Sequence, residues 1–274
     1  MTNYHPSLIA ATKVTNLIKQ HAADAELAGE LTPQQIQLIY DHNWFNLYIP
    51  SELGGLETPL PVAIRLLEIL ARADASFGWT VTLCSGANWF AGFLDKTLCA
   101  SLWSNKQVCI AGSGAATGKA SITKNGYIVK GDWKYATGAP HATVFSANCI
   151  IEKDGEPLLT EDNTPVLKAF IFTRDEVEIR HNWNTIGMKA TASHSFSVKA
   201  LELPFSRSFI IHPDQAVLPD LIFQIPFQSF AEITLAANFS GIAAHFIEEC
   251  KRLYEDRIKR HAYAITETCE MLDL

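Results

Sequence analysis

The sequence predicts a multi-domain fold with both α and β structure. We expect an N-terminal all-helical domain over residues 1–105, a middle antiparallel β-barrel or sandwich over 106–215, and the start of an incomplete C-terminal helical bundle over 216–274. Three observations predict this order. Apolar residues recur at helical spacing through the first hundred positions. Short β-branched and aromatic runs separated by turn residues then fill residues 108–211, and helical spacing returns after Pro219.

Local helix signals support the N-terminal domain. Apolar residues fall at helical spacing between Ile9 and Ile18. The segment from Thr32 to Gln35 combines an N-cap hydroxyl, a first-turn proline and a glutamine placed to close a capping box, so we expect a second helix from there to about His42. Proline and paired glycines in residues 50–55 end that region, and two or three further helices are expected before Trp103.

Turn signals define the middle domain. Asn125 and Gly126 separate two runs of strand-forming residues at 120–123 and 127–129, which is a typical hairpin pattern. Further strands are expected at 144–151, 168–173, 176–180 and 195–203. About a hundred residues of this kind favour a compact barrel or sandwich.

The last helical region carries a wide apolar stripe from Phe230 towards Arg257. A stripe of this width must be covered, either by the earlier helices or by another chain. We therefore expect at least a dimer, either a homodimer or a homotetramer.

Composition excludes several classes of function. The net charge of -7 and the pI near 5.7 argue against a nucleic-acid surface, because no cluster of Lys and Arg is present. The N-terminal residues do not form a signal peptide and no run of about 20 apolar residues is evident, so we expect no membrane span and a cytoplasmic location. Six scattered cysteines without a Cys-x-x-Cys pair favour reduced thiols over disulfides or a metal site.

Three segments in order resemble landmarks of the acyl-CoA dehydrogenase superfamily. The first is the Pro-x-x-x-Gly-Gly turn at residues 50–55, and the second is the stretch 131–138 followed by His141 and Ala142. The third is the stretch 186–194, which is followed ten residues later by Pro204. The resemblance extends over roughly residues 30–245. It implies a helical domain, then a β-rich domain, then a second helical domain, with a bound flavin.

The resemblance also implies which residues would hold that flavin, FAD or alternatively reduced FMN. Tyr135 takes the place of the family's aromatic ring against the flavin, and Thr137 takes the place of the hydroxyl near its N5 and O4 atoms. The preceding strand would contribute main-chain contacts, with Thr117 where the family's phosphate-binding serine falls. Alanine and glycine replace the family's Thr-Glu pair in that strand, and its expected flavin contacts are Ile110, Ala111, Gly112 and Ser113.

Two branches of the superfamily remain open from the motifs. The dehydrogenase branch would act on an acyl-CoA with a carboxylate base, whereas the reduced-flavin-dependent monooxygenase branch would hydroxylate an aromatic or heteroatom substrate. Ala192-Ser193-His194 is closer to the monooxygenase motifs. No catalytic residue is predicted. Glu232 is expected to be an exposed surface residue, and His194 either orients substrate or flavin or is a capping or solvated loop residue.

The resemblance implies a helical bundle that extends a hundred or more residues further, so we expect either a fragment or natural truncation, or a protein that has lost part of the site. The alternative from another class is a non-catalytic binding or scaffold protein on a degenerate flavoenzyme fold.

Overall fold

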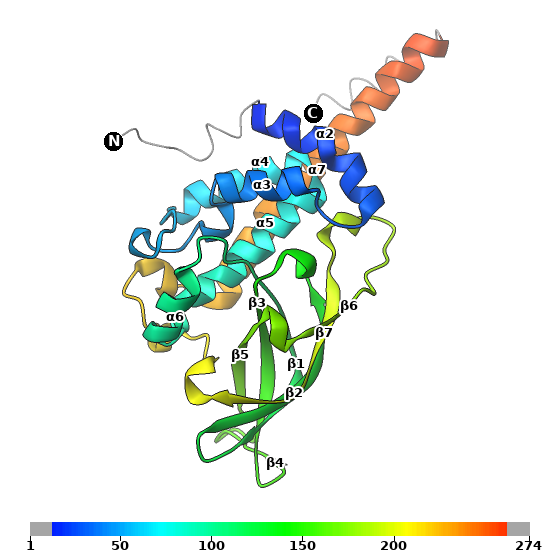
Figure 1. The fold of residues 1–274 in the computed structure, drawn as a ribbon. Coiled ribbons are helices and arrows are strands. Elements are labelled where there is room, and N and C mark those ends of the chain that lie inside the picture. Colours follow the sequence, from blue (N-terminus) through cyan, green and yellow to red (C-terminus); the bar gives the residue numbers. More distant parts are fainter. Residues whose placement is uncertain (1–12, 262–274) are drawn as a thin grey trace.

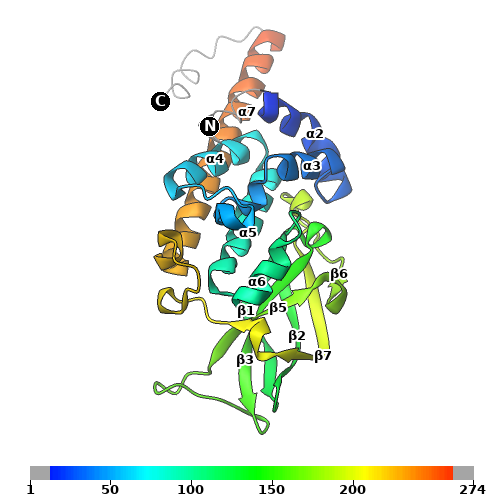
Figure 2. The same ribbon diagram turned by 60° about the vertical axis from the view of Figure 1, so that its left-hand side comes forward.

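The computed structural model describes residues 13–261, so the predictions that fall on Ile9 and Cys269 lie outside the described residues. A helical layer covers one end of a β-sheet, and a long last helix runs along the helical layer and projects beyond it (Figures 1 and 2). The α-helices are α2 Thr15–Ala28, α3 Pro33–Asp41, α4 Leu60–Ala73, α5 Ala75–Asn88, α6 Lys96–Trp103 and α7 Phe227–His261.

The predicted start of α3 is confirmed. The Gln35 backbone N–H donates to Thr32 Oγ1 (3.3 Å), and the Thr32 backbone N–H donates to Gln35 Oε1 (3.0 Å). Proline occupies the first helical position, where no backbone N–H is needed. Neighbouring residues therefore determine where this helix begins.

The middle region forms one eight-stranded sheet in the order β6-β7-β2-β1-β3-β5-β8, with β4 paired to β3. The strands are β1 Ile110–Ile122, β2 Gly126–Ala136, β3 Val144–Lys153, β4 Glu156–Pro157, β5 Leu167–Thr173, β6 Glu178–Arg180, β7 His194–Pro204 and β8 Ser208–Phe209. The predicted hairpin at Asn125 and Gly126 joins β1 to β2 and is confirmed. The prediction of a wholly antiparallel domain needs one correction, because β3 crosses over the hairpin and pairs in parallel with β1.

Two apolar cores hold these layers together. One lies within the sheet around the buried Trp133, whose ring stacks on Phe196 at a centroid distance of 5.2 Å. The other joins the helices to the near end of the sheet and includes Ile110 and Phe209 together with Phe230 of α7. Helices and sheet therefore share apolar contacts along their junction.

Asn88, at the end of α5, attaches the helical layer to the sheet. Its side-chain amide donates to Asn46 Oδ1 (3.0 Å) and to the Val108 carbonyl oxygen (3.0 Å). Its Oδ1 accepts from the Ile110 backbone N–H (2.9 Å). Asn88 is fully buried, so these bonds form away from water and hold the start of β1 against α5.

Helix α7 packs along α4 through one face only. Ser240 Oγ donates to Glu68 Oε1 (2.7 Å), and Arg72 of α4 forms an ion pair with Glu248. On the outer face Phe239, Phe246 and Leu253, spaced seven residues apart, are more than half exposed. The earlier helices therefore cover only part of the predicted apolar stripe.

Within the described residues, α7 also has the length and apolar composition of a membrane-spanning helix over Phe227–Arg257. The mean hydropathy of its most apolar window is 1.3, and 22% of that window is buried. Core helices of soluble proteins pass the same test, so one helix of this kind is weak evidence for a span. The expected absence of a membrane span stays a prediction.

The cysteine thiols within residues 13–261 are all free, and four of the five are buried. Burial raises the pKa of the Cys99 thiol to about 11 and that of Cys149 to about 12, so both stay protonated near neutral pH. In the same part of the chain, no group of three His, Cys, Asp or Glu side chains is arranged to hold a metal ion.

Candidate functional site

A cavity of about 170 Å³ lies where α5 and α7 meet strands β1 and β3, and we call it the Thr137 cavity. Helix α5 contributes Thr82 and Gly86, while strand β1 contributes residues 110–114. Strand β3 contributes Ser146 and Asn148, and α7 adds apolar side chains including Phe230. The bond network of Asn88 holds the beginning of β1 in place and thereby shapes this wall.

Five of the seven residues predicted to hold a flavin line this cavity. They are Ile110, Ala111, Gly112, Ser113 and Thr137. Their convergence brings together the β1 segment and the end of β2, which are more than twenty residues apart in the sequence. Their role in flavin binding stays a prediction.

The other two predicted residues lie outside the cavity. Tyr135 is 51% exposed, and its ring meets that of Trp183 edge-on at a centroid distance of 5.2 Å. Thr117 is exposed, and its hydroxyl donates to the Asp132 carbonyl oxygen (2.7 Å). The exposed Tyr135 ring can stack on a ligand. The Thr117 hydroxyl already donates its hydrogen bond within the protein.

Thr137 is the head of a buried hydroxyl chain. Trp79 Nε1 donates to Thr137 Oγ1 (3.2 Å), and Thr137 Oγ1 lies 2.9 Å from Ser193 Oγ. Ser193 Oγ in turn lies 2.8 Å from Thr191 Oγ1. The Thr191 hydroxyl donates to the Met188 carbonyl oxygen (2.9 Å), which can only accept.

The Met188 carbonyl oxygen, at the end of this row of hydroxyls, determines which hydroxyl donates and which accepts at each step. The Thr191 hydroxyl donates its hydrogen bond to a carbonyl oxygen, so it can only accept from Ser193. Ser193 thus donates to Thr191 and must accept from Thr137. The only hydroxyl proton of Thr137 thus points away from the cavity. What Thr137 can offer to a ligand is a lone pair on Oγ1.

Gly112 lets β1 approach β3 at the cavity wall. A Cβ atom at this position would lie 2.5 Å from the Ser146 carbonyl oxygen, which is closer than real Cβ contacts allow. The two residues are register partners in the parallel pair of strands. A glutamate in the place of Gly112, as in the family's Thr-Glu pair, would not fit this approach.

Strand β1 departs from regular pairing with β3 beyond Ser113. Its register with β3 shifts between Ser113 and Gly118. In this stretch side chains bond to β2, because Ser113 Oγ donates to the Lys134 carbonyl oxygen (2.6 Å) and Thr117 does the same to Asp132. Gly114 and Ala115 between them are exposed, so a ligand can reach the β1 main chain here.

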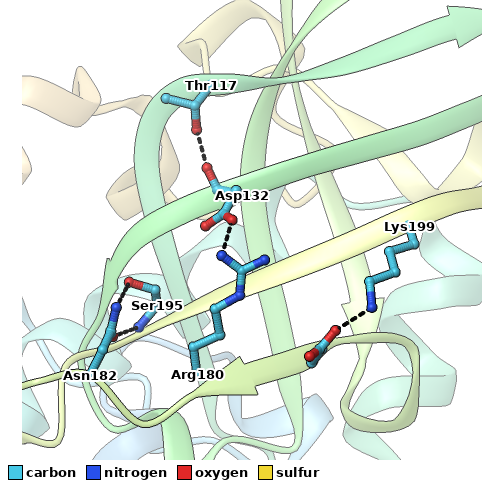
Figure 3. A network of polar contacts seen from close by, with 7 residues as sticks. Thr117, Asp132, Arg180, Asn182, Ser195 and Lys199 are labelled. Atoms are coloured by element: carbon cyan, nitrogen blue, oxygen red, sulfur yellow. Dashed lines mark hydrogen bonds and ion pairs between the residues drawn. The ribbon is translucent and has the colours of Figure 1, made fainter.

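Figure 3 shows the polar network beyond Thr117 on the outer strands. The Asp132 carboxylate forms an ion pair with Arg180 of β6, and Lys199 of β7 pairs with Glu178 at 2.7 Å. Each positive charge in this network has a carboxylate partner. Arg180 would therefore have to exchange its Asp132 contact to bind a phosphate.

Ionisable groups lie outside the Thr137 cavity, since none of its described lining residues carries one. Glu232 is exposed, as expected, and its Oε1 accepts from Gln228 Nε2 (2.9 Å). His194 is half-buried, and its Nδ1 accepts from the Trp183 backbone N–H (3.0 Å). Burial, and then the charge of nearby His181, lower the pKa of His194, which favours the neutral ring.

Sequence reasoning missed the residues that other elements bring to the cavity. Ser146 lies near the start of β3 and Thr82 in the middle of α5. A serine in a strand or a threonine in a helix has no local pattern that distinguishes a binding residue from a packing residue. Only the parallel pairing of β1 with β3 places Ser146 next to Gly112.

Comparison with known proteins agrees with this architecture. Residues 10–91 match the family described as "Acyl-CoA dehydrogenase, N-terminal domain". The chain resembles the 3-HSA hydroxylase from Rhodococcus sp. RHA1 with a TM-score of 0.85, at 20% identity, over 96% of this chain and 68% of the other. The chain therefore has the acyl-CoA dehydrogenase fold, with an N-terminal helical region, a central mixed sheet and a long C-terminal helix.

Its homologues are oxygenase components of flavin-dependent monooxygenases. It is 24% identical to the oxygenase subunit HsaA of Mycobacterium tuberculosis over 86% of this chain and 61% of HsaA. It is 25% identical to the oxygenase component of p-hydroxyphenylacetate 3-hydroxylase of Acinetobacter baumannii over 92% of this chain and 61% of that protein. The chain thus spans about three fifths of the length of these curated relatives.

Two similar structures contain a flavin. XiaF from Streptomyces sp. was solved with FADH2 and glycerol, and it matches 89% of this chain and 62% of its own at 20% identity, with a TM-score of 0.77. TdsC from Paenibacillus sp. A11-2 was solved with FMN and indole, and it matches 90% of this chain and 64% of its own at 18% identity, with a TM-score of 0.69.

Proposed function

We propose that this chain binds a reduced flavin, FADH2 or reduced FMN, and hydroxylates an aromatic substrate held in the Thr137 cavity. One oxygen atom of O2 enters the substrate as a hydroxyl group and the other leaves as water, with both electrons supplied by the reduced flavin. Similar proteins support this proposal, since XiaF was solved with FADH2, TdsC with FMN and indole, and one relative is a hydroxylase of p-hydroxyphenylacetate. A cytoplasmic location and a homo-oligomeric state stay predictions.

The direction of the Thr137 hydroxyl chain carries this proposal. Thr137 accepts from Trp79 and donates to Ser193, so it has a lone pair and no proton left for a ligand. A reduced flavin has an N–H group at N5 that can donate to this lone pair, whereas the N5 atom of an oxidised flavin can only accept. The site therefore favours the reduced cofactor.

Two features support a flavin ring beside this cavity. Tyr135 offers an exposed aromatic face, and the small residues of β1 after Gly112 leave the main chain open. These groups would hold and orient the ring, with Thr137 Oγ1 positioned to meet its N–H group. The flavin would supply the redox chemistry, and the protein would supply binding, orientation and exclusion of water.

The dehydrogenase alternative has less support from the described residues. That chemistry needs a carboxylate within hydrogen-bonding reach of the α-proton of an acyl-CoA. The lining of the Thr137 cavity contains no carboxylate among the residues described, and Glu232 on α7 is exposed and does not line it.

An anaerobic titration tests the proposal. Wild type, Thr137→Ser and Thr137→Val are each titrated with oxidised and reduced FAD and FMN, and the dissociation constants are compared. Wild type should bind the reduced form about tenfold more tightly, because tenfold corresponds to the net free energy of about one hydrogen bond. Thr137→Val should lose most of that preference because it keeps the shape without the hydroxyl, while Thr137→Ser should keep it.

Further outcomes distinguish the alternatives. Isotopically labelled O2 supplied with reduced flavin and indole should give a product that contains one labelled oxygen atom. Binding of neither flavin form would contradict the proposal and support a non-catalytic binding or scaffold protein. Tighter binding of the oxidised form, with bleaching of its absorbance by an acyl-CoA, would support a dehydrogenase instead.

A further inference from the structure

Most polar side chains of the Thr137 cavity already have protein partners. Thr82 Oγ1 donates to the Gly78 carbonyl oxygen (2.7 Å) and accepts from Asn238 Nδ2 (2.9 Å). Thr234 Oγ1 donates to the Phe230 carbonyl oxygen (3.0 Å) in its own helix. Ser113 is bonded to β2, and Thr137 belongs to the hydroxyl chain. These groups have little capacity left for a ligand.

Ser146 is the exception among the hydroxyls that line the cavity. Ser146 is only 4% exposed, it lies on the cavity wall, and none of the hydrogen bonds within residues 13–261 uses its hydroxyl. Asn148, two residues further along β3, has its Nδ2 group bonded to the Gly114 carbonyl oxygen (2.9 Å). A hydroxyl at the cavity wall that makes no hydrogen bond to the protein is free to pair with a polar atom of a ligand.

The rest of the lining has two properties that restrict the ligand. The rings of Phe90 and Phe227 lie 5.5 Å apart between centroids, and Phe230 adds a third aromatic side chain. No ionisable side chain of the described residues lines the cavity, so a carboxylate inside it would have no opposite charge. Its volume of about 170 Å³ is comparable to that of an apolar protein cavity of about 150 Å³ that binds benzene.

We infer that Ser146 is a specificity-determining residue, whose hydroxyl binds the polar atom of an uncharged substrate with one or two aromatic rings. The cavity accordingly discriminates against analogues that carry a carboxylate. This inference rests on the proposed function for the identity of the site, but it concerns recognition of the substrate and not of the flavin.

Three ring compounds test the inference in binding experiments with the full chain, with and without flavin. Indole and indene have similar shape, but only indole has an N–H group, and indole-3-acetate adds a carboxylate to the indole ring. Wild type should bind indole about tenfold more tightly than indene, the value of one net hydrogen bond. Indole-3-acetate should bind at least about tenfold more weakly than indole, because its charge loses water without gaining a partner.

Ser146→Ala should remove the preference for indole over indene without lowering the midpoint of thermal unfolding, because the hydroxyl makes no bond in the free protein. Ser197→Ala is the matched control. Ser197 is also 4% exposed, but its unpartnered hydroxyl is fully buried on β7 and does not line the cavity. This variant should keep the preference. Ser146→Cys is the second variant, should the alanine variant fail to fold.

The inference is overturned if wild type does not bind indole or binds indene equally well. It is also overturned if the preference survives in both Ser146 variants, or if indole-3-acetate binds as tightly as indole. Failure of the proposed function has a different signature, namely loss of reduced-flavin binding in the titration of Thr137 variants. The two experiments therefore fail independently.

Discussion

Trp79 of α5 and Thr137 at the end of β2 are joined by a hydrogen bond of 3.2 Å from the indole Nε1 to the threonine hydroxyl oxygen. The bond crosses from the helical layer to the sheet beside the Thr137 cavity. The bond uses one lone pair of the Thr137 hydroxyl oxygen, while the hydroxyl itself donates a hydrogen bond to Ser193. Helix α5 thus takes part in determining what Thr137 presents to a ligand.

Trp79→Phe should weaken the selection of reduced flavin. The phenyl ring can keep the contact that the indole makes with Phe239 (centroids 5.8 Å apart), but it cannot donate to Thr137. We expect the preference for reduced over oxidised flavin to fall by about threefold to tenfold and the free energy of unfolding by about 1 kcal/mol. Anaerobic titration and urea unfolding measure these quantities.

Trp103→Phe is the control for this substitution. Trp103 Nε1 donates to Asn46 Oδ1 (2.9 Å) in the helical layer and does not line the cavity. Its loss should lower stability by a similar or greater amount and leave the flavin preference unchanged. An equal change of flavin preference in both variants would show that Trp79→Phe alters this preference only by lowering the stability of the fold.

Two glycines of α5 should respond in opposite ways to substitution by alanine, because only Gly78 packs closely against α4. A Cβ atom on Gly78 would lie 2.4 Å from the Ala71 Cα atom, so Gly78→Ala forces the helices apart. On Gly86 the nearest atom would be Phe230 Cε1 at 3.9 Å. Gly78→Ala should destabilise by about 1–3 kcal/mol, and Gly86→Ala should stabilise by up to about 1 kcal/mol.

Urea unfolding followed by circular dichroism measures both shifts. Because both residues lie within α5, the gain in helix propensity is common to them and only the space beside each differs. A stability gain in both variants would mean that α4 and α5 are not packed as closely as the structure shows.

The features predicted from the sequence are those that neighbouring residues determine. The capping box of Thr32 and Gln35 and the hairpin at Gly126 require only residues a few positions apart, and both are confirmed. The parallel pairing of β1 with β3 was not predicted, because an alternating pattern of apolar residues does not state which strand will be the neighbour.

The same reasoning explains the candidate site. Thr137 was selected through a resemblance of motifs, and the structure adds what no motif contains, the direction of its proton. That direction depends on Trp79 and Thr191, which come from two other segments of the chain. Ser146 was missed, since only the packing of β3 against β1 distinguishes it from other strand serines.

A half-buried histidine after β2, with a buried Nε2 atom, predicts a loss of stability in acid. His141 lies in the short 3-10 helix Ala139–His141, and its Nε2 atom is buried without a partner among the described residues. Burial lowers the pKa of His141 to about 4, from an ordinary value near 6.5. Between these two values the unfolded chain binds a proton that the folded chain does not.

Stability therefore rises with pH across this window, and the contribution of His141 is complete above about pH 6.5 and lost as the pH falls towards 4. The pKa difference corresponds to at most about 3 kcal/mol. His141→Phe should flatten the pH dependence of the unfolding free energy by up to this amount. Urea unfolding at a series of pH values from 4 to 7 provides the measurement. An unaltered slope in the His141 variant would show that this ring takes up its proton equally well in the folded and unfolded states.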